Sequence, residues 1–441
     1  MDLRIRKTTQ LTGEITPPGS KSYSHRAFIL AGLADGTSTL KNPLVSGDVL
    51  VTLQILEKLG VKIQQHQENI FKVYGKQQFQ TKFDQPIDCK NSGTSIRIFS
   101  ALSLLIDGGL TFKGEFLQKN RPLLPLLEAL TNLGAQYRLK DEELHIHRTS
   151  QECKNLQIRG DISSQFITAL LITGPLLKCK KKEQILIKTT TPLISYPYIK
   201  ITLNILNAFG VKIEEKQYKE GLLEYKLKLN QKLKPQVYEI PSDFSSAAFI
   251  IAASVLSPTK SQVIIKNLYF KDPQGDKRII DILKKMGAKI KVNDHKNQLI
   301  CYGNIKKNKL RGIEVDCKEI PDLFPILSVI GAYAQGKMVL YNAEGLRLKE
   351  SDRISIMARE LQKMGVKIEE YLDKLIIYHC DNLKGAKIDH EQDHRIAMAC
   401  TIAALYASEE SEIHNIEIVE DSYPTFVEDL IKLGANIKKI S

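Results

Sequence analysis

The sequence predicts an α/β protein with two domains, each built from three similar units. Two observations carry this prediction. A length of 441 residues favours two to three domains over a single one. A short pattern, L-x-x-[LFM]-G-[VA]-x-[IY], recurs six times at spacings of 74, 76, 77, 78 and 69 residues. Six copies at such regular intervals indicate one repeated supersecondary unit of about 75 residues.

The glycine of each copy marks the end of a predicted helix. Glycine has no Cβ, so it readily adopts the left-handed conformation that ends many helices. A short alternating segment follows, as in residues 366–369, and predicts a strand. The six junctions between helix and strand are expected at Gly60, Gly134, Gly210, Gly287, Gly365 and Gly434.

Two breaks in the chain suggest where the domains begin. Leu233–Val237 is polar, contains proline and lies between the third and fourth copies, so it predicts a hinge. Pro17–Gly19 is a second break. We therefore expect residues 19–236 to form the first domain and residues 237–441 the second, with residues 1–18 as an N-terminal strand that belongs to the second domain.

The charge balance points to an acidic partner. Lys and Arg number 63 against 50 Asp and Glu, which gives a formal net charge of +13. The 43% of hydrophobic and 26% of charged residues are typical of a soluble globular protein and exclude a disordered one. Nucleic acid, a membrane surface and small phosphorylated substrates all remain open as partners.

The cysteines and the apolar segments favour the cytoplasm. Seven cysteines are scattered, odd in number and without a C-x-x-C pair, so we expect neither a disulfide framework nor a zinc knuckle. The first ten residues, MDLRIRKTTQ, have no apolar signal-peptide core. The longest apolar runs, such as Ala247–Leu256, are too short to span a bilayer.

Polar turns precede several apolar helices in the first half of the chain. The stretch Pro17–Gly36 leads from a Pro-Gly turn into a helix with Lys21, Ser22 and Arg26 in its first turns. Free N–H groups and the positive end of the helix dipole make such a start an anion site when cations lie beside it. The spacing does not fit a Walker A loop. Similar turns lie at Cys89–Arg97, Gly160–Gln165 and Ser242–Ser246.

The second half carries charged helix starts of the same kind. Glu319–Asp322 precedes an apolar stretch, Leu346–Arg353 packs five charges into eight residues, and Asp393–Arg395 opens another apolar helix. Each segment by itself is also compatible with an ordinary capped, solvated helix start. Together they predict a site built from helix N-termini.

Two histidine patterns resemble metal sites but do not predict one. His390–His394 matches H-E-x-x-H, the zinc-protease pattern, which needs both histidines on one face of a helix. Here the residues before it resemble a strand end and Asp393 resembles the cap of the next helix, so the motif spans a loop. His145 and His147 alternate as on one face of a surface strand. We therefore expect no metal.

Taken together, these motifs resemble the EPSP synthase family of enolpyruvyl transferases. The resemblance extends from Pro18 to Pro424 and rests on PGSKSYSHR, NSGTSIR, KNRP, GDISSQFITALL, SYPYIKITLNILNAFGV, IPD, LRLKESDR and DHRIAMA. It implies a fold of two inside-out α/β barrels of three repeats each. It also implies an active site in the cleft between the domains, faced by helix N-termini.

The resemblance implies a reaction and its residues. The enolpyruvyl group of phosphoenolpyruvate would pass to the 5-hydroxyl of shikimate 3-phosphate with loss of phosphate, through a tetrahedral ketal, on the route to chorismate and the aromatic amino acids. Residues that match shikimate 3-phosphate contacts are Lys21, Ser22, Arg26, Ser163, Ser164, Gln165, Ser195, Tyr198, Asp322 and Lys349. Residues that match phosphoenolpyruvate contacts are Lys21, Gly93, Arg121, Gln165, Glu350, Arg353, His394 and Arg395.

The implied chemistry accounts for these residue types. Two anionic substrates need several cations, and the planar fork of arginine pairs well with carboxylate and phosphate. Asp322 matches the candidate base for the hydroxyl, and Glu350 and Lys21 match groups that move protons at the methylene carbon. The resemblance implies no metal or organic cofactor and a monomeric enzyme.

The chain departs from the family at three positions. Asp421 stands where the family has a lysine, Gly345 where it has an asparagine, and Ile98 where many members have proline. The change at Asp421 reverses a charge at a phosphoenolpyruvate contact. We expect activity to survive these changes.

Three other kinds of protein fit parts of this pattern. A UDP-N-acetylglucosamine enolpyruvyl transferase shares the fold but needs a loop cysteine, and Leu117–Arg121 contains none. A nucleic-acid-binding protein would suit the charge, but it needs cations clustered with aromatics on one face. A catalytically inactive relative that only binds is compatible with the departures at Asp421 and Gly345.

Overall fold

The computed structural model describes residues 1–76, 79, 85–119 and 121–440, so Asn120 of the KNRP motif lies outside the described residues. The chain forms two compact units. The N-terminal unit comprises residues 19–240, and the C-terminal unit comprises residues 1–18 and 241–441. The chain therefore passes from the N-terminal unit back to the C-terminal unit after residue 240, whereas the sequence predicted this boundary after residue 236. The reason is that Val237–Glu239 pair in parallel with Thr39–Lys41 of the N-terminal unit.

The N-terminal unit contains three four-stranded sheets, ordered β14-β3-β5-β4, β6-β7-β9-β8 and β10-β11-β13-β12. Each sheet has one parallel pair and two antiparallel pairs. Its strands are β3 (Thr37–Lys41), β4 (Lys62–Gln67), β5 (Ile70–Tyr74), β6 (Ile87–Asp88), β7 (Leu110–Lys113), β8 (Ala135–Lys140), β9 (Glu143–Arg148), β10 (Leu156–Ile158), β11 (Gln184–Thr189), β12 (Glu214–Lys219), β13 (Leu222–Lys228) and β14 (Val237–Glu239). Its helices are α1 (Lys21–Leu33), α2 (Gly47–Lys58), α3 (Gly93–Leu102), α4 (Glu115–Gln118), α5 (Leu124–Thr131), α6 (Ser164–Thr173) and α7 (Tyr196–Ala208), with short 3-10 helices η1 (Ser103–Leu105) and η2 (Gly174–Leu176).

The C-terminal unit repeats this topology in the sheets β2-β15-β17-β16, β18-β19-β21-β20 and β22-β23-β1-β24. Its strands are β1 (Asp2–Ile5), β2 (Thr12–Ile15), β15 (Ser261–Ile265), β16 (Lys289–Asn293), β17 (Gln298–Gly303), β18 (Glu314–Asp316), β19 (Lys337–Tyr341), β20 (Ile368–Glu370), β21 (Leu375–Tyr378), β22 (Lys387–Ile388), β23 (Ser411–Ile413) and β24 (Ile437–Ile440). Its helices are α8 (Phe244–Leu256), α9 (Ile279–Met286), α10 (Phe324–Tyr333), α11 (Arg353–Lys363), α12 (His394–Leu405) and α13 (Phe426–Lys432). Its 3-10 helices are η3 (Gly275–Arg278), η4 (Asp294–Lys296), η5 (Pro321–Leu323), η6 (Glu344–Leu348) and η7 (Ile416–Asp421).

Strands from distant parts of the chain complete three of the six sheets. In the C-terminal unit, β1 pairs with β23 and β24, and β2 pairs with β15. In the N-terminal unit, β14 pairs with β3. The predicted N-terminal segment therefore contributes two strands, one to each of two sheets, where a single strand was expected.

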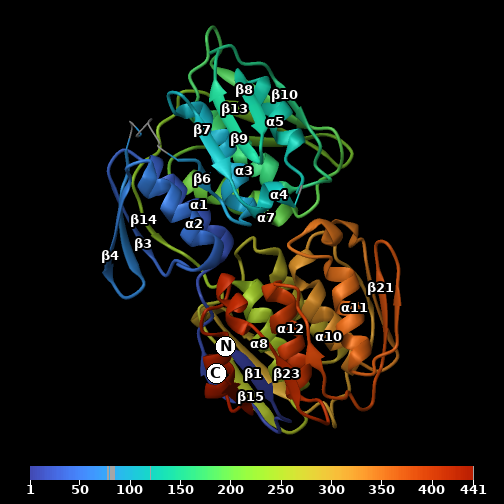
Figure 1. The fold of residues 1–441 in the computed structure, drawn as a ribbon. Helices are drawn as coiled ribbons and strands as arrows, with labels where there is room; N and C mark the ends of the chain where they lie inside the picture. The colour runs from blue at the N-terminus through green and yellow to red at the C-terminus, as the bar shows by residue number, and fades with distance from the viewer. Residues whose placement is uncertain (77–78, 80–84, 120, 441) are drawn as a thin grey trace. The chain divides into compact units, whose positions relative to one another are not determined.

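One helix of every repeat is buried in the centre of its unit. Every residue of α8 and of α12 is buried, and α1, α3, α6 and α10 are buried over most of their length. Beyond their polar N-terminal turns, their sequences are mainly apolar on every face, which a helix tolerates only inside a core. Within the C-terminal unit, α8, α10 and α12 lie side by side with β15, β21 and β23 outside them (Figure 1). Each unit is therefore an inside-out α/β barrel, as the resemblance implied.

The six repeat glycines confirm the predicted helix ends. All have positive φ, between +86° and +104°, and follow α2, α5, α7, α9, α11 and α13. At Gly134 and Gly60 a Cβ would also meet neighbouring atoms within 3.0 Å. Strands follow each glycine, as the alternating segments predicted.

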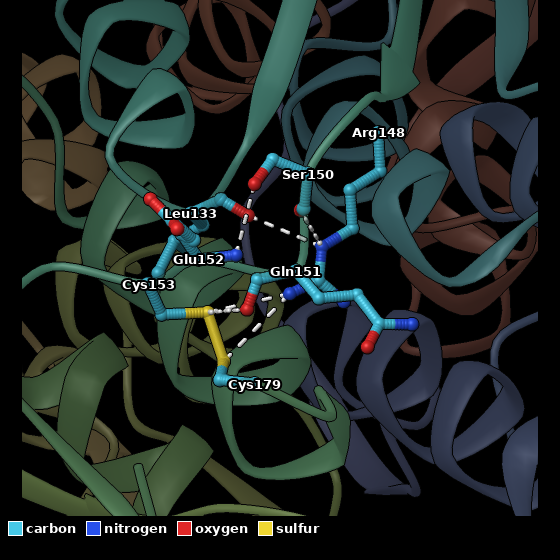
Figure 2. Close-up of a disulfide and its surroundings, with 7 residues drawn as sticks. All are labelled: Leu133, Arg148, Ser150, Gln151, Glu152, Cys153 and Cys179. Carbon is cyan, nitrogen blue, oxygen red and sulfur yellow. Dashed lines mark hydrogen bonds between the residues drawn. A yellow bond between two sulfur atoms is a disulfide. The ribbon is translucent and has the colours of Figure 1, made fainter. Parts of the chain in front are cut away.

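One cysteine pair contradicts the expectation drawn from the cysteine pattern. Cys153 and Cys179 form a disulfide with their Cα atoms 5.8 Å apart (Figure 2). They lie 26 residues apart in loops that meet only after folding, so their spacing gave no signal. Cys89, Cys301, Cys317 and Cys400 are buried free thiols, and Cys380 is a half-buried one.

Within the described ranges, we find no helix with the length and apolar character needed to cross a membrane.

Candidate functional site

The buried helices of the N-terminal unit begin at the polar turns that the sequence singled out. α1, α3 and α6 start at Lys21, Gly93 and Ser164. Ser92 accepts a hydrogen bond from the Ser95 amide at 3.3 Å, and Ser163 accepts one from the Gln165 amide at the same distance. Ser163 and Ser164 therefore lie at the start of α6, as predicted.

Two guanidinium groups flank Gly93. A Cβ at this position would lie 3.2 Å from Arg97 Nη1 and 3.2 Å from Arg121 Nη2. The centres of both guanidinium groups lie 5.0 Å from the centroid of the Phe116 ring, which packs against them. Arg121 also donates to the Asn91 carbonyl at 2.9 Å. Two cations beside the start of a buried helix are suited to hold an anion.

Gln165 joins the starts of α3 and α6. Its Oε1 accepts from Arg97 Nη1 at 2.6 Å, and its Nε2 donates to Thr94 Oγ1 at 3.0 Å. Arg97 is held further by the Pro122 carbonyl, to which Nη2 donates at 2.8 Å. Sequence reasoning assigned Arg97 no role. Its position four residues after Gly93, one helical turn away, was the available signal.

Arg26 connects three helices. It is 2% exposed and donates from Nε to Thr202 Oγ1 at 2.8 Å, and from Nη2 to Thr168 Oγ1 at 3.2 Å and to the Tyr198 carbonyl at 3.4 Å. Nη1 donates to the Ser22 carbonyl at 2.7 Å. Burial lowers the pKa of Arg26 to about 10. These contacts give Arg26 a positioning role for α1, α6 and α7 beside the predicted substrate contact.

Lys21 forms an ion pair that the sequence did not predict. Its Nζ lies 3.0 Å from Asp48 Oδ2, in the first turn of α2. The exposed fractions of the two side chains are 15% and 22%, so the pair remains accessible to a ligand.

Ser195 and Tyr198 lie at the start of α7. Ser195 is buried and has a left-handed φ of +54°, and its backbone carbonyl accepts a hydrogen bond from the Tyr198 amide at 3.1 Å.

A chain of buried hydroxyl groups ties α1, α2 and α3 together. His25 Nδ1 lies 2.7 Å from Thr52 Oγ1, and Thr52 Oγ1 lies 2.9 Å from Ser95 Oγ. Ser92 Oγ donates to Ser95 Oγ at 2.8 Å. Burial lowers the pKa of His25 to about 3, so the imidazole is neutral near pH 7. His25 thus fixes the helix starts without adding charge.

In the C-terminal unit, Arg353 gathers three carboxylates. It donates from Nε to Asp393 Oδ2 at 2.8 Å, from Nη1 to Asp322 Oδ1 at 3.0 Å and from Nη2 to Glu350 Oε2 at 2.9 Å. Burial alone lowers the pKa of Arg353, but Asp393, Glu350 and Asp322 raise it more, so it lies above its ordinary value. We call these residues, with Arg395, the Arg353 cluster.

Arg395 holds the second oxygen of Asp322. Its Nη2 lies 3.1 Å from Asp322 Oδ2, so two arginines orient this carboxylate. Asp322 belongs to η5, directly before α10, and its side chain is 17% exposed. The predicted base is therefore fixed in orientation and still reachable from outside.

A buried acid next to this cluster was missed by the sequence. Asp276 is 3% exposed and accepts a hydrogen bond from Ser245 Oγ at the start of α8. Burial, and next the Asp322 charge, raise the pKa of Asp276 to about 7. Asp276 lies in η3, outside every motif, so only the fold reveals it.

The other predicted residues lie around the same helix starts. His394 is the buried first residue of α12, and Lys349 is half-buried directly after η6. Asp243 caps α8, accepting from the Ser245 and Ser246 amides at 2.7 and 3.2 Å. Of the two departures in this unit, Asp421 ends η7, and a Cβ at Gly345 would meet no atom within 4 Å.

The H-E-x-x-H pattern does not lie on one helix. α12 begins at His394 with Asp393 as its N-cap, so His390 precedes the helix, as predicted. His145 and His147 lie on β9 with ring centroids 5.0 Å apart, and His145 Nδ1 lies 2.9 Å from Thr111 Oγ1. Among the residues with described positions, no group of three or more His, Cys, Asp or Glu is arranged to hold a metal.

Comparisons with known proteins agree on one family. Residues 5–430 match the family model described as EPSP synthase (3-phosphoshikimate 1-carboxyvinyltransferase). A 3-phosphoshikimate 1-carboxyvinyltransferase of Methanococcus maripaludis is 41% identical and covers 99% of this chain and 100% of its own. The structure of an EPSP synthase from Acinetobacter baumannii matches with a TM-score of 0.78 and 27% identity, covering 99% of both chains. The enolpyruvyl transferase NikO from Streptomyces tendae, at 18% identity and a TM-score of 0.79, shares the fold.

Proposed function

The chain belongs to the EPSP synthase (3-phosphoshikimate 1-carboxyvinyltransferase) family, and from that premise we propose that it transfers the enolpyruvyl group of phosphoenolpyruvate to the 5-hydroxyl of shikimate 3-phosphate. The products are 5-enolpyruvylshikimate 3-phosphate and phosphate. The observation that carries the proposal is the Arg353 cluster, where two arginines orient one accessible carboxylate, Asp322.

Shikimate 3-phosphate is assigned mainly to the N-terminal unit. The starts of α1, α6 and α7 supply hydroxyl groups, amides and the Lys21 ammonium, which suit a phosphate and a hydroxylated ring. Arg26 keeps these three starts together through its buried hydrogen bonds. Asp322 and Lys349 would complete this substrate's contacts from the C-terminal unit.

Phosphoenolpyruvate is assigned to cations of both units. Arg121 beside Gly93 offers a planar fork, and Arg353 and Arg395 offer two more. Gln165 and His394 add hydrogen-bonding groups. Because a single addition joins the two substrates, the proposal requires both sets of helix starts to act at one site.

The proposed chemistry is addition followed by elimination. Asp322 takes the proton of the 5-hydroxyl group as the oxygen of that hydroxyl bonds to the central carbon of phosphoenolpyruvate. The methylene carbon gains a proton from Glu350 or Lys21, which gives a tetrahedral ketal phosphate. The same carbon then returns a proton to Glu350 or Lys21 as phosphate departs with the electron pair of its C–O bond, which restores the double bond. The surrounding cations stabilise the negative charge throughout.

Two finer assignments belong to the proposal. We expect a monomer that acts in the cytoplasm. Sedimentation at assay concentrations tests the first, because a stable dimer would contradict it.

A phosphate-release assay with both substrates tests the reaction. Wild-type protein should release phosphate only when both substrates are present. Asp322→Ala should abolish release, and calorimetry should show shikimate 3-phosphate binding that is weakened by the lost contact but not abolished. Asp316→Ala is the matched control, because Asp316 ends β18 outside the Arg353 cluster. No release by the wild type would reject the reaction. Equal release by Asp322→Ala would reject Asp322 as the base.

A further inference from the structure

The Cys153–Cys179 disulfide lies apart from the candidate site. Cys179 follows the C-terminal end of α6, whereas Ser164 and Gln165 lie at the N-terminal end of the same helix. Ten residues of α-helix span about 15 Å. The disulfide is therefore separate from the residues assigned to the substrates, and its chemistry does not depend on the proposed function.

The two cysteines of the disulfide differ in exposure. Cys153 is 5% exposed, and Cys179 is half-buried. In thiol–disulfide exchange, a thiolate attacks one sulfur and the other leaves as a thiolate. Attack from solvent is therefore expected at Cys179, with Cys153 as the leaving group.

Arg148 is placed to stabilise that leaving group. Its Nη2 lies 3.3 Å from Cys153 Sγ and 3.7 Å from Cys179 Sγ (Figure 2). Its Nε donates to the Ser150 carbonyl at 2.9 Å and to the Leu133 carbonyl at 3.2 Å, which fixes the guanidinium beside the sulfurs. A neighbouring cation favours the thiolate form of cysteine, and a better-stabilised thiolate leaves faster.

A basic cavity opens beside Cys179. Its volume is about 580 Å³, within the range of small-molecule sites. Lys178, Lys182 and Lys228 line it against a single carboxylate, Glu183. The excess of positive charge favours a ligand that carries carboxylates.

We propose that Cys179 is a site of reversible modification by small acidic thiols. The thiolate of such a molecule attacks Cys179 Sγ, the Cys153–Cys179 bond breaks, and Cys153 leaves as a thiolate beside Arg148. The acidic thiol stays on Cys179 as a mixed disulfide with its carboxylates against the lysines. The Cys153 thiolate restores the original bond by attacking Cys179 Sγ and expelling the acidic thiol, so no further oxidant or reductant is needed.

The test uses glutathione, which has two carboxylates, and glutathione diethyl ester, which has none ionised. Oxidised full-length protein is incubated with each thiol, and the adduct is measured by intact mass and located by peptide mapping. We expect one adduct per chain, on Cys179, with a yield about two- to fivefold higher for glutathione than for the ester at equal thiolate concentration. Free thiols such as Cys380 do not react with reduced glutathione, so they do not interfere.

Variants separate the parts of the proposal. Lys182→Glu should remove the preference for glutathione and leave the reaction with the ester unchanged, and Lys384→Glu, an exposed lysine of the other unit, should change neither. Arg148→Gln should slow adduct formation with both thiols. The proposal would be overturned by an adduct on Cys153 or by no adduct in the folded protein. It would also be overturned by equal yields for both thiols, or by Cys153 and Cys179 remaining reduced under air oxidation.

Discussion

Arg353 and Asp393 form an ion pair at 2.8 Å in which the side chains are 2% and 0% exposed. Asp393 also caps α12, accepting from the Arg395 amide at 2.9 Å. The pair therefore links the first residue of α11 to the start of α12, the helix that carries Arg395. It therefore joins the two helix starts that supply Arg353 and Arg395 to the Arg353 cluster.

Replacing Asp393 with alanine should strongly destabilise the C-terminal unit. The change leaves the Arg353 guanidinium without its most buried partner and removes the α12 cap. The expected loss is about 3–5 kcal/mol in the free energy of unfolding, the cost of breaking a buried pair. Urea denaturation followed by circular dichroism measures it.

Asp352→Ala is the matched control, because Asp352 caps α11 at the surface and accepts from the Ser355 amide at 3.1 Å. Its loss should cost about 1–2 kcal/mol, for one cap and one partly exposed ion pair with Arg347. Equal destabilisation by both variants would contradict a special role for the buried pair.

Local sequence patterns predicted where helices start and end. The features that the sequence did not predict are contacts between distant segments, which depend on the packing of the whole fold. Gly60 was identified because the left-handed end of a helix favours glycine at one position, and Gly93 because its motif matches the family. The contacts of Arg26 with Thr202 and of Lys21 with Asp48 join different helices, so no spacing in the sequence predicts them. Asp276 was missed because its raised pKa arises from burial, which only the fold creates.

The misplaced domain boundary has the same origin. Residues 237–239 carry no signal that assigns them to either unit. Their register against β3, with Val237 opposite Thr39, settles the assignment. The proline-containing stretch before them was a true break in secondary structure but not the point where the chain changes units.

Gly93→Ala should weaken the proposed phosphoenolpyruvate contacts. The added methyl would lie 3.2 Å from Arg97 Nη1, Arg121 Nη2 and Phe116 Cε2, so at least one of these groups must move. We expect the KM for phosphoenolpyruvate to rise at least about tenfold, with a much smaller change in the KM for shikimate 3-phosphate. Steady-state kinetics measure both constants. Equal increases would indicate a general disturbance of the fold.

Asp276 should make stability fall as pH rises through the weakly acidic range. Its folded pKa of about 7 lies above the ordinary value of 3.8, so between these limits the folded state binds more protons than the unfolded state. The contribution of Asp276 to the free energy of unfolding is therefore highest below about pH 4 and declines until about pH 7. Urea denaturation from pH 4.5 to 7.5 should show Asp276→Asn gaining stability relative to wild type as pH rises. The surface control Asp281→Asn should not gain, and a constant difference for Asp276→Asn would contradict the raised pKa.

Asp421 offers a test of the departures from the family pattern. Asp421→Lys restores the charge that the family carries at this position, at the end of η7. If phosphoenolpyruvate binds as proposed, exchanging an anion for a cation should lower its KM several-fold and leave the KM for shikimate 3-phosphate nearly unchanged. Stable Asp421→Lys protein with a raised KM for phosphoenolpyruvate would show that this chain binds the substrate without a cation at position 421. Gly345→Asn restores the other family residue as a companion variant, and open space around a Cβ there predicts that the fold tolerates it.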